Sequence, residues 1–100
     1  MASSKEYLQF ILDQLSDLDG ITYRKMMGEY IIYYQSKIVG GIYDDRFLIK
    51  PFKSVMEYIP EITYEIPYEG AKPMILIKEV DSKEFLTGLF EVIYDDLSKK

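Results

Sequence analysis

Two residue types that carry much of enzyme chemistry are missing from this sequence of 100 residues. It contains no cysteine and no histidine. Catalysis through Ser-His or Cys-His pairs is therefore excluded, and so are disulfide bonds. The side chains that usually bind zinc, haem and iron–sulfur centres are absent as well. We therefore expect no metal centre of these kinds and no cofactor.

One pair of residues matches a catalytic pattern by its spacing. Tyr33 and Lys37 are spaced like the Tyr-x-x-x-Lys pair of short-chain dehydrogenases. The chain is rich in both residue types, with ten tyrosines among its 100 residues, so about one such match is expected by chance. No glycine-rich dinucleotide-binding turn accompanies the pair. We therefore reject this interpretation.

Adjacent carboxylates occur twice, at Asp44-Asp45 and at Asp95-Asp96. Their oxygen atoms are of the kind that Mg²⁺ and Ca²⁺ prefer. Acidic residues in a hairpin turn or at a helix end more often serve solvated turn chemistry, and we favour that role here. No pair of glutamate and lysine stands out by its spacing as an acid/base site. We predict that the protein is not an enzyme and has no catalytic or metal-binding residues.

The elements that must position these side chains begin with a helix. Ser3 and Glu6 have the spacing of a capping box. Apolar residues follow at helical intervals, namely Leu8, Ile11, Leu12, Leu15 and Leu18. Gly20 stands where a left-handed cap would end the helix.

From residue 21 to residue 50 the apolar period changes to two. Four short runs rich in β-branched and aromatic residues predict four strands, in residues 21–25, 30–34, 38–43 and 46–50. "QSK" separates the second run from the third, and Asp44-Asp45 separates the third from the fourth. Gaps this short require antiparallel pairing. Gly40-Gly41 indicates a bulge or a close backbone approach.

The second half of the chain predicts a helix, two strands and a final helix. The short helix spans about Phe52 to Ile59, with Ser54 and Glu57 as a capping pair. The strands are "ITYEIP" and "MILIK", and we expect the second of them to be central in the sheet. A helix starting near Asp81 follows, with Glu84 completing its cap, and "DDLSKK" is expected to fray. The order α-β-β-β-β-α-β-β-α predicts a two-layer α+β fold, with helices packed on an antiparallel sheet. We expect a single domain over residues 1–100.

Charge is unevenly distributed along the chain, whose net charge is −5. Residues 21–53 carry six basic side chains and three acidic ones, whereas both flanking segments are acidic. We favour a solvated surface for these bases. The alternative function is a small nucleic-acid-associated factor that uses residues 21–53, where bases stand beside aromatics as in Tyr23-Arg24-Lys25.

The N-terminus lacks the pattern of a signal peptide, and no apolar run approaches the length of a membrane span. We therefore predict a cytoplasmic protein that does not bind membranes.

The middle of the chain resembles the N-terminal domain of the TfoX/Sxy family, which is associated with natural competence. The resemblance rests on a basic-methionine-glycine turn, a tyrosine-bearing strand, a short glycine-containing strand, and an Asp hairpin before a final strand. The residues are Arg24, Met26, Met27, Gly28, Tyr30, residues 39–42, Asp44, Asp45, Phe47, Leu48 and Lys50. Met27 and Glu29 stand where the family often has an aromatic residue and a second glycine, and "PYEGAKPMIL" also departs from its pattern. The resemblance implies an α+β fold and a regulatory, non-enzymatic role linked to competence or transcription.

Methionines and tyrosines provide the candidate interaction surface. Met26 and Met27 either fill gaps beneath the helices, which we favour, or form an adaptable contact surface. Tyrosine is enriched at interfaces because its ring buries well while its hydroxyl stays hydrated. If helices cover one sheet face only, a homodimer that stacks sheets or joins edges would bury the other aromatics. We predict a homodimer and a further, unidentified protein partner, with a candidate surface of Arg24, Lys25, Met27, Tyr30, Tyr34 and Lys50.

Overall fold

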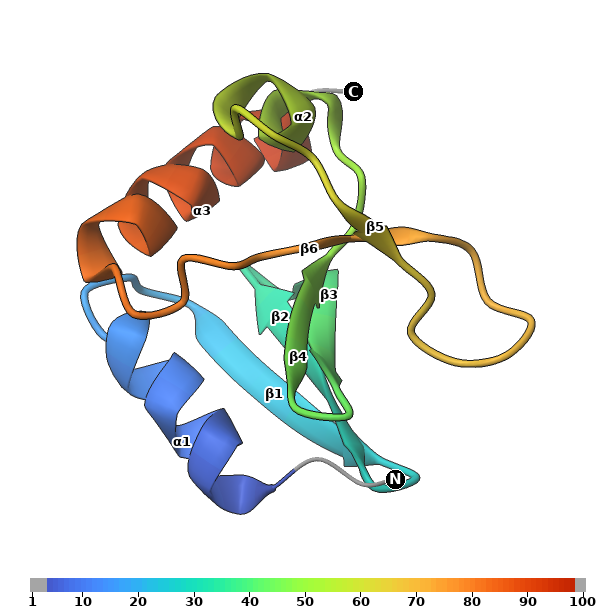
Figure 1. Ribbon diagram of the computed structural model, residues 1–100. Helices are drawn as coiled ribbons and strands as arrows, with labels where there is room; N and C mark the ends of the chain where they lie inside the picture. Colours follow the sequence, from blue (N-terminus) through green and yellow to red (C-terminus); the bar gives the residue numbers. More distant parts are fainter. Residues whose placement is uncertain (1–3, 99–100) are drawn as a thin grey trace.

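The computed structural model describes residues 4–98 and shows helices on one face of a single sheet (Figure 1). The helices are α1 (Lys5–Gln14), α2 (Lys53–Tyr58) and α3 (Lys83–Ser98). The strands are β1 (Ile21–Met26), β2 (Glu29–Tyr34), β3 (Lys37–Tyr43), β4 (Arg46–Ile49), β5 (Tyr64–Glu65) and β6 (Met74–Leu76). The predicted α+β class and the predicted order of elements are confirmed.

All six strands pair antiparallel, in the spatial order β1-β2-β3-β4-β6-β5. Strands β1 and β5 are thus the edges of the sheet. The "MILIK" strand is shorter than predicted and lies second from one edge, between β4 and β5, so it is not central. The "ITYEIP" strand is reduced to two residues.

The first four strands are joined by three turns of two residues each. Both residues of every turn have positive φ: Met27 and Gly28, Gln35 and Ser36, and Asp44 and Asp45. Two successive left-handed residues are the signature of a type I′ turn, whose twist matches that of the strands it joins. Gly28, with φ of +86°, suits its place in the first turn because glycine adopts this conformation without steric cost. Lys37 belongs to β3 rather than to the connection, so "QSK" is a two-residue turn followed by a strand residue.

The two neighbouring glycines of β3 allow the backbones to approach closely, as predicted. A Cβ on Gly40 would lie 2.2 Å from the carbonyl oxygen of Leu48, and one on Gly41 would lie 2.6 Å from that of Tyr30. The register between β2 and β3 shifts next to this point, between Ile32 and Tyr33. The shift leaves one extra residue in β3, which is a β-bulge.

The core lies between the helices and one face of the sheet. Alternate residues of β2, namely Tyr30, Ile32 and Tyr34, point into it. The three helices contribute apolar side chains to the core, with Ile11, Val55 and Phe90 all fully buried. Because every helix of residues 4–98 packs on this face, this part of the chain places no helix over the opposite face of the sheet (Figure 1).

Two helix caps are displaced by one residue from their predicted positions. Ser4 caps α1, with its Oγ accepting the N–H of Tyr7 at 3.1 Å. Ser82 caps α3 in the same way, accepting the N–H of Phe85 at 3.2 Å. Asp81 was predicted to cap α3, and this is wrong. Ser3, which was predicted to cap α1, lies outside the described residues, and the observed cap is Ser4. In each case a serine is followed three residues later by the N–H that it accepts, as N-capping requires.

The cap predicted for α2 is also wrong. The N-cap position is Phe52, which provides no side-chain hydrogen bond. The carboxylate of Asp96 in α3 instead accepts the N–H of Ser54 at 3.0 Å and its hydroxyl at 2.5 Å. This contact holds the short α2 against α3, and it explains why the "DDLS" segment remains helical to Ser98 instead of fraying.

Gly20 is left-handed, with φ of +86°, but it does not cap α1, which ends at Gln14. Its carbonyl oxygen accepts the N–H of Gln35 at 3.0 Å. Gly20 therefore starts the β1–β2 ladder instead of closing the helix.

Replacing Gly40 by alanine tests the close crossing of β3 and β4. The new Cβ meets backbone, which cannot rotate away, so we expect Gly40→Ala to lower the free energy of unfolding by about 3 kcal/mol in urea titrations. The matched control is Gly70→Ala, where φ is +88° but no atom lies within 4 Å of the new Cβ. There we expect about 1 kcal/mol, from the backbone conformation alone. Equal effects at the two glycines would contradict the close-approach argument.

Candidate functional site

The open face of the sheet, away from the helices, carries its own row of side chains. Residues that pair directly across strands share a face. The pairs Arg24–Ile31, Ile31–Gly41, Gly41–Leu48 and Leu48–Leu76 therefore place one continuous row on this face. Leu48 is fully buried although it lies outside the main core cluster. Part of the open face is thus covered.

Tyr43 and Tyr68 provide cover on this face. The ring of Tyr43 lies over Gly41, where a Cβ would come within 2.8 Å of its Cε2 atom. Tyr43 is only 7% exposed. The ring of Tyr68, in the loop between β5 and β6, packs against it with a centroid separation of 6.2 Å. A glycine on the strand thus makes room for one aromatic ring, and the loop supplies a second.

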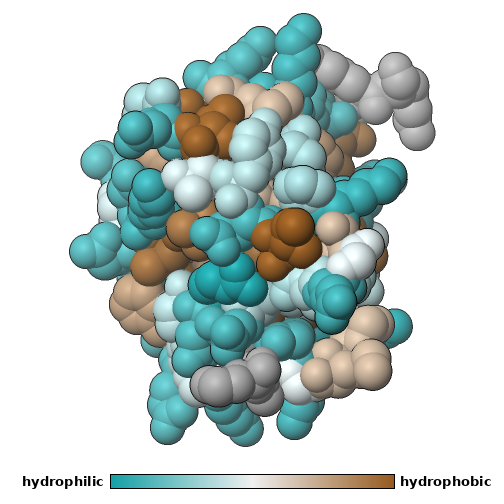
Figure 2. All heavy atoms as spheres, turned by 45° about the vertical axis from the view of Figure 1, so that its right-hand side comes forward, coloured by the Kyte–Doolittle hydropathy of each residue, from teal (hydrophilic) through white to brown (hydrophobic). Residues whose placement is uncertain are grey.

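Beside these rings lies an apolar hollow of about 440 Å³, lined by Met26, Met27, Glu29, Ile31, Tyr43 and Tyr68. Met27 is 96% exposed at the tip of the β1–β2 turn, and Tyr68 is 63% exposed. Figure 2 brings the side of the loop between β5 and β6 forward and shows apolar side chains as separate brown groups among hydrophilic ones. Methionine and tyrosine are residues that adapt well to apolar partners.

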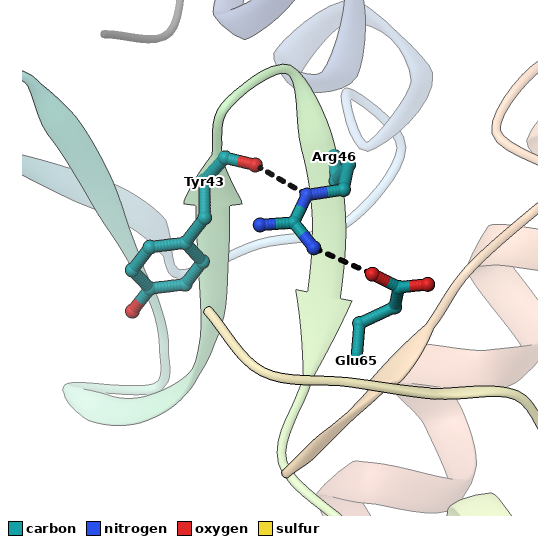
Figure 3. Close-up of polar contacts among 3 residues, drawn as sticks. All are labelled: Tyr43, Arg46 and Glu65. Carbon is teal, nitrogen blue, oxygen red and sulfur yellow. Dashed lines mark hydrogen bonds and ion pairs between the residues drawn. The ribbon is translucent and has the colours of Figure 1, made fainter. Parts of the chain in front are cut away.

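Arg46 links the backbone of Tyr43 to the side chain of Glu65 (Figure 3). The Nε of Arg46 donates to the carbonyl oxygen of Tyr43 at 3.1 Å, and its guanidinium lies 2.7 Å from the carboxylate of Glu65. Glu65 ends β5, immediately before the loop that carries Tyr68. Both charged groups remain partly exposed, so this ion pair contributes alignment more than stability.

The electrostatics of the hollow are dominated by burial. The pKa of the Tyr43 phenol is raised above its ordinary value by burial, then by the neighbouring Tyr68, then by the charge of Glu29. The Glu29 carboxylate also accepts the N–H of Asp44 at 3.1 Å, which ties β2 to the β3–β4 turn. The site therefore combines a neutral, protonated phenol, two methionines and one carboxylate that is engaged with backbone.

Two of the six predicted surface residues are in the core. Tyr30 and Tyr34 are each 6% exposed. The ring of Tyr30 packs edge-on against Tyr23 at 5.9 Å, and that of Tyr34 against Phe90 at 5.3 Å. Placing these two tyrosines on an interaction surface was wrong, because their strand face is the one that the helices cover.

The other four predicted residues are exposed but are not brought together. Arg24 lies on the open face, whereas the neighbouring Lys25 points to the opposite face, since strand side chains alternate. Met27 is at the β1–β2 turn. Lys50 follows β4 at the other end of the sheet and lies 5.8 Å from the centroid of the Phe52 ring.

The interpretation of Met26 and Met27 as core residues is wrong, since they are 48% and 96% exposed.

Both acidic pairs make structural contacts. Asp44 and Asp45 form a turn, and the carboxylate of Asp45 accepts the N–H of Ser4 at 2.8 Å. Asp96 holds α2 as described. Within residues 4–98, no group of three or more Asp or Glu side chains is placed to hold a metal ion. Tyr33 and Lys37 point to opposite faces, because Lys37 pairs with Tyr34, so the dehydrogenase-like spacing does not assemble.

A larger hollow of about 650 Å³ lies on the helix side and is more open to solvent. Its polar groups include Tyr58, whose hydroxyl donates to the carbonyl oxygen of Phe85 at 3.0 Å. They also include Lys83, whose amine is 3.7 Å from the carboxylate of Asp17. Tyr58 and Lys83 are thus each engaged with another group of the protein.

Sequence reasoning missed Ile31, Tyr43 and Tyr68 as members of the hollow. The alternation of β2 separates Ile31 from Tyr30 and Tyr34, but it does not say which of the two faces the helices cover. Tyr68 stands in a loop whose path also depends on tertiary packing.

The chain is similar to a protein of Spirochaeta aurantia described as an uncharacterized 12.7 kDa protein in the trpE 5′ region. The two are 38% identical over 74 residues, which make up 72% of this chain and 63% of that protein. The chain thus matches a little under two thirds of its relative's length. No family model matches the chain. No solved structure matches it either. The resemblance to the TfoX/Sxy family therefore stays a prediction.

Within the described part of the chain, none of the helices is both long and apolar enough to cross a lipid bilayer.

Tyr43 makes the stability of the fold sensitive to alkaline pH. Its pKa is raised in the folded chain, as are those of Tyr7, Tyr34 and Tyr58, each mainly through burial. Above about pH 10 an unfolded tyrosine loses its proton while these folded ones keep theirs, so the folded state binds more protons and stability falls as pH rises. We expect a smaller fall between about pH 9 and 11 for Tyr43→Phe, measured as urea midpoints. An unchanged pH dependence would contradict the assignment.

Proposed function

We propose that this chain is a non-enzymatic protein-interaction module that binds an apolar segment of another protein in the hollow on its open sheet face. The observation that carries the proposal is the convergence of Met26, Met27 and Tyr68 on one hollow while each stays about half exposed or more. Exposed large apolar side chains that gather around a concavity mark binding sites more often than scattered ones do.

The chemistry of the hollow supports binding rather than reaction. A phenol is protonated at neutral pH, and burial raises the pKa of Tyr43 further above that range. A tyrosine acting as a general base requires the opposite shift. The carboxylate of Glu29 is held by the N–H of Asp44. The surface that remains is made of thioether, aliphatic and aromatic groups, which recognise shape and apolar area.

A regulatory role of the TfoX/Sxy type, linked to competence or transcription, is the setting that we propose for this binding. Support comes from the α+β fold, which that resemblance implies, and from its turn residue Met27, which lines the hollow. In this setting the module would act by holding another protein and not by chemical conversion.

The hollow can be tested with peptides selected for binding to the whole chain from a random library. We expect amide NMR shifts on peptide addition to cluster at Ile31, Gly41 and Tyr43. Met27→Glu should weaken peptide binding about tenfold or more, because it places a charge in an apolar contact. Phe10→Ser is the control, since Phe10 is 39% exposed on the helix side. Peptides that shift the helix-side amides instead, or that bind Met27→Glu as tightly as the unchanged chain, would refute this function.

A further inference from the structure

Among residues 4–98, strand β1 is the long edge of the sheet and pairs on one side only. It forms one end of the strand order, and its burial pattern is intermediate at Ile21 and exposed at every later residue. The opposite edge, β5, has only two residues. An edge strand presents unpaired N–H and C=O groups that can pair with another strand. The ladder between β1 and β2 has no bulge that would bend this edge away from a partner strand.

The residues whose backbone groups point outward follow from the β1–β2 turn. In a two-residue hairpin the flanking residues, Met26 and Glu29, are hydrogen-bonded to each other. Hydrogen-bonded and non-hydrogen-bonded pairs then alternate along an antiparallel ladder. Gly20 fits this alternation, since its carbonyl oxygen accepts the N–H of Gln35. Ile21, Tyr23 and Lys25 therefore turn their N–H and C=O groups toward the free edge.

Charge along this edge has opposite signs at its two ends. Arg24 and Lys25 are exposed near the end of β1, and Asp17 and Asp19 are exposed just before its start. In an antiparallel pair of identical strands, the basic end of one β1 lies beside the acidic segment that precedes β1 in the other copy. Charged edge strands normally discourage association. Here the arrangement discourages parallel pairing and favours antiparallel self-pairing.

We infer that two copies of this chain pair through their β1 edges, antiparallel, with Tyr23 opposite the partner's Tyr23 at the two-fold axis. In this register Lys25 faces the partner's Ile21. The backbone groups of Ile21, Tyr23 and Lys25 in each strand then all pair with the other copy. Each such pair exchanges two hydrogen bonds, so about six form in total. A shift by two residues in either direction would use only two of these pairs. The result is one continuous sheet across both copies.

A hollow beside the edge fits the side chain that this register brings to it. The hollow, of about 510 Å³, lies between α1 and β1 and is lined mainly by apolar groups, including Leu18, Ile21 and Tyr23. Lys25 points to this helix side of the sheet, since it pairs with the buried Tyr30. The aliphatic stem of the partner's Lys25 would lie along the hollow, with its ammonium group toward Asp19. The apolar lining of the hollow and the charge of Asp19 both complement Lys25, so a second copy of this chain is the partner that fits this hollow.

The register can be measured by disulfide cross-linking, because the natural chain has no cysteine. Tyr23→Cys places two thiols opposite each other, within the Cα separation that a disulfide tolerates. We expect it to cross-link under mild oxidation at least about tenfold faster than Thr22→Cys or Arg24→Cys alone. Mixing Thr22→Cys with Arg24→Cys should give the mixed dimer preferentially, since these positions face each other in this register. Equal rates for all variants would overturn the proposal.

The charge pairing can be measured by sedimentation equilibrium with an exchange of charges. Lys25→Glu and Asp19→Lys should each weaken the dimer about threefold to tenfold, because each places like charges at two symmetric contacts. Mixing the two variants should restore association to near its original strength, since every contact in the mixed dimer again joins opposite charges. Lys50→Glu is the matched control and should have no effect. A chain that sediments as a monomer up to about millimolar concentration, or a mixture that associates no better than its parts, would refute the edge dimer.

Discussion

The structure depends on the register that three consecutive type I′ turns impose on β1 to β4. Each turn has two residues and fixes the pairing beside it, and the bulge between Ile32 and Tyr33 then shifts the β2–β3 register by one residue. A slip by one residue would move every side chain of that strand to the other face. With the register set, Tyr30, Ile32 and Tyr34 all enter the core, and Ile31 and Tyr43 are left on the face that no helix covers. The core and the candidate site are thus two consequences of the same constraint.

Residue patterns predict much of this architecture. The change of apolar period at Ile21 separates helix from strands, and the Asp44-Asp45 gap indicates a tight hairpin. The close approach at Gly40-Gly41 follows from the absence of side chains there. What the patterns cannot settle is which of two adjacent polar residues acts as the cap. The caps were predicted at Ser3 and Asp81, one position before the observed Ser4 and Ser82, since neighbouring Ser and Asp residues satisfy similar spacing rules.

The candidate site was harder to predict than the fold because it depends on which sheet face the helices cover. Alternation places Tyr30 and Tyr34 together, but it does not say which face receives α1 and α3. The Ser54–Asp96 contact, between residues 42 positions apart, and the packing of Tyr68 on Tyr43 are long-range events with no local signal. The six surface residues chosen from sequence consequently divide among the core, both faces and both ends of the sheet.

The open-face hollow and the β1 edge are separate surfaces that share one strand. Side chains of β1 alternate, so Arg24 and Met26 belong to the open face while Tyr23 and Lys25 belong to the helix side. Pairing through the edge uses backbone groups and the helix-side residues, and it leaves Met26 and Met27 uncovered. Two paired copies would therefore present two hollows on the same side of one continuous sheet. A partner with two apolar segments would gain from binding both at once, since the second contact forms at the high effective concentration set by the first.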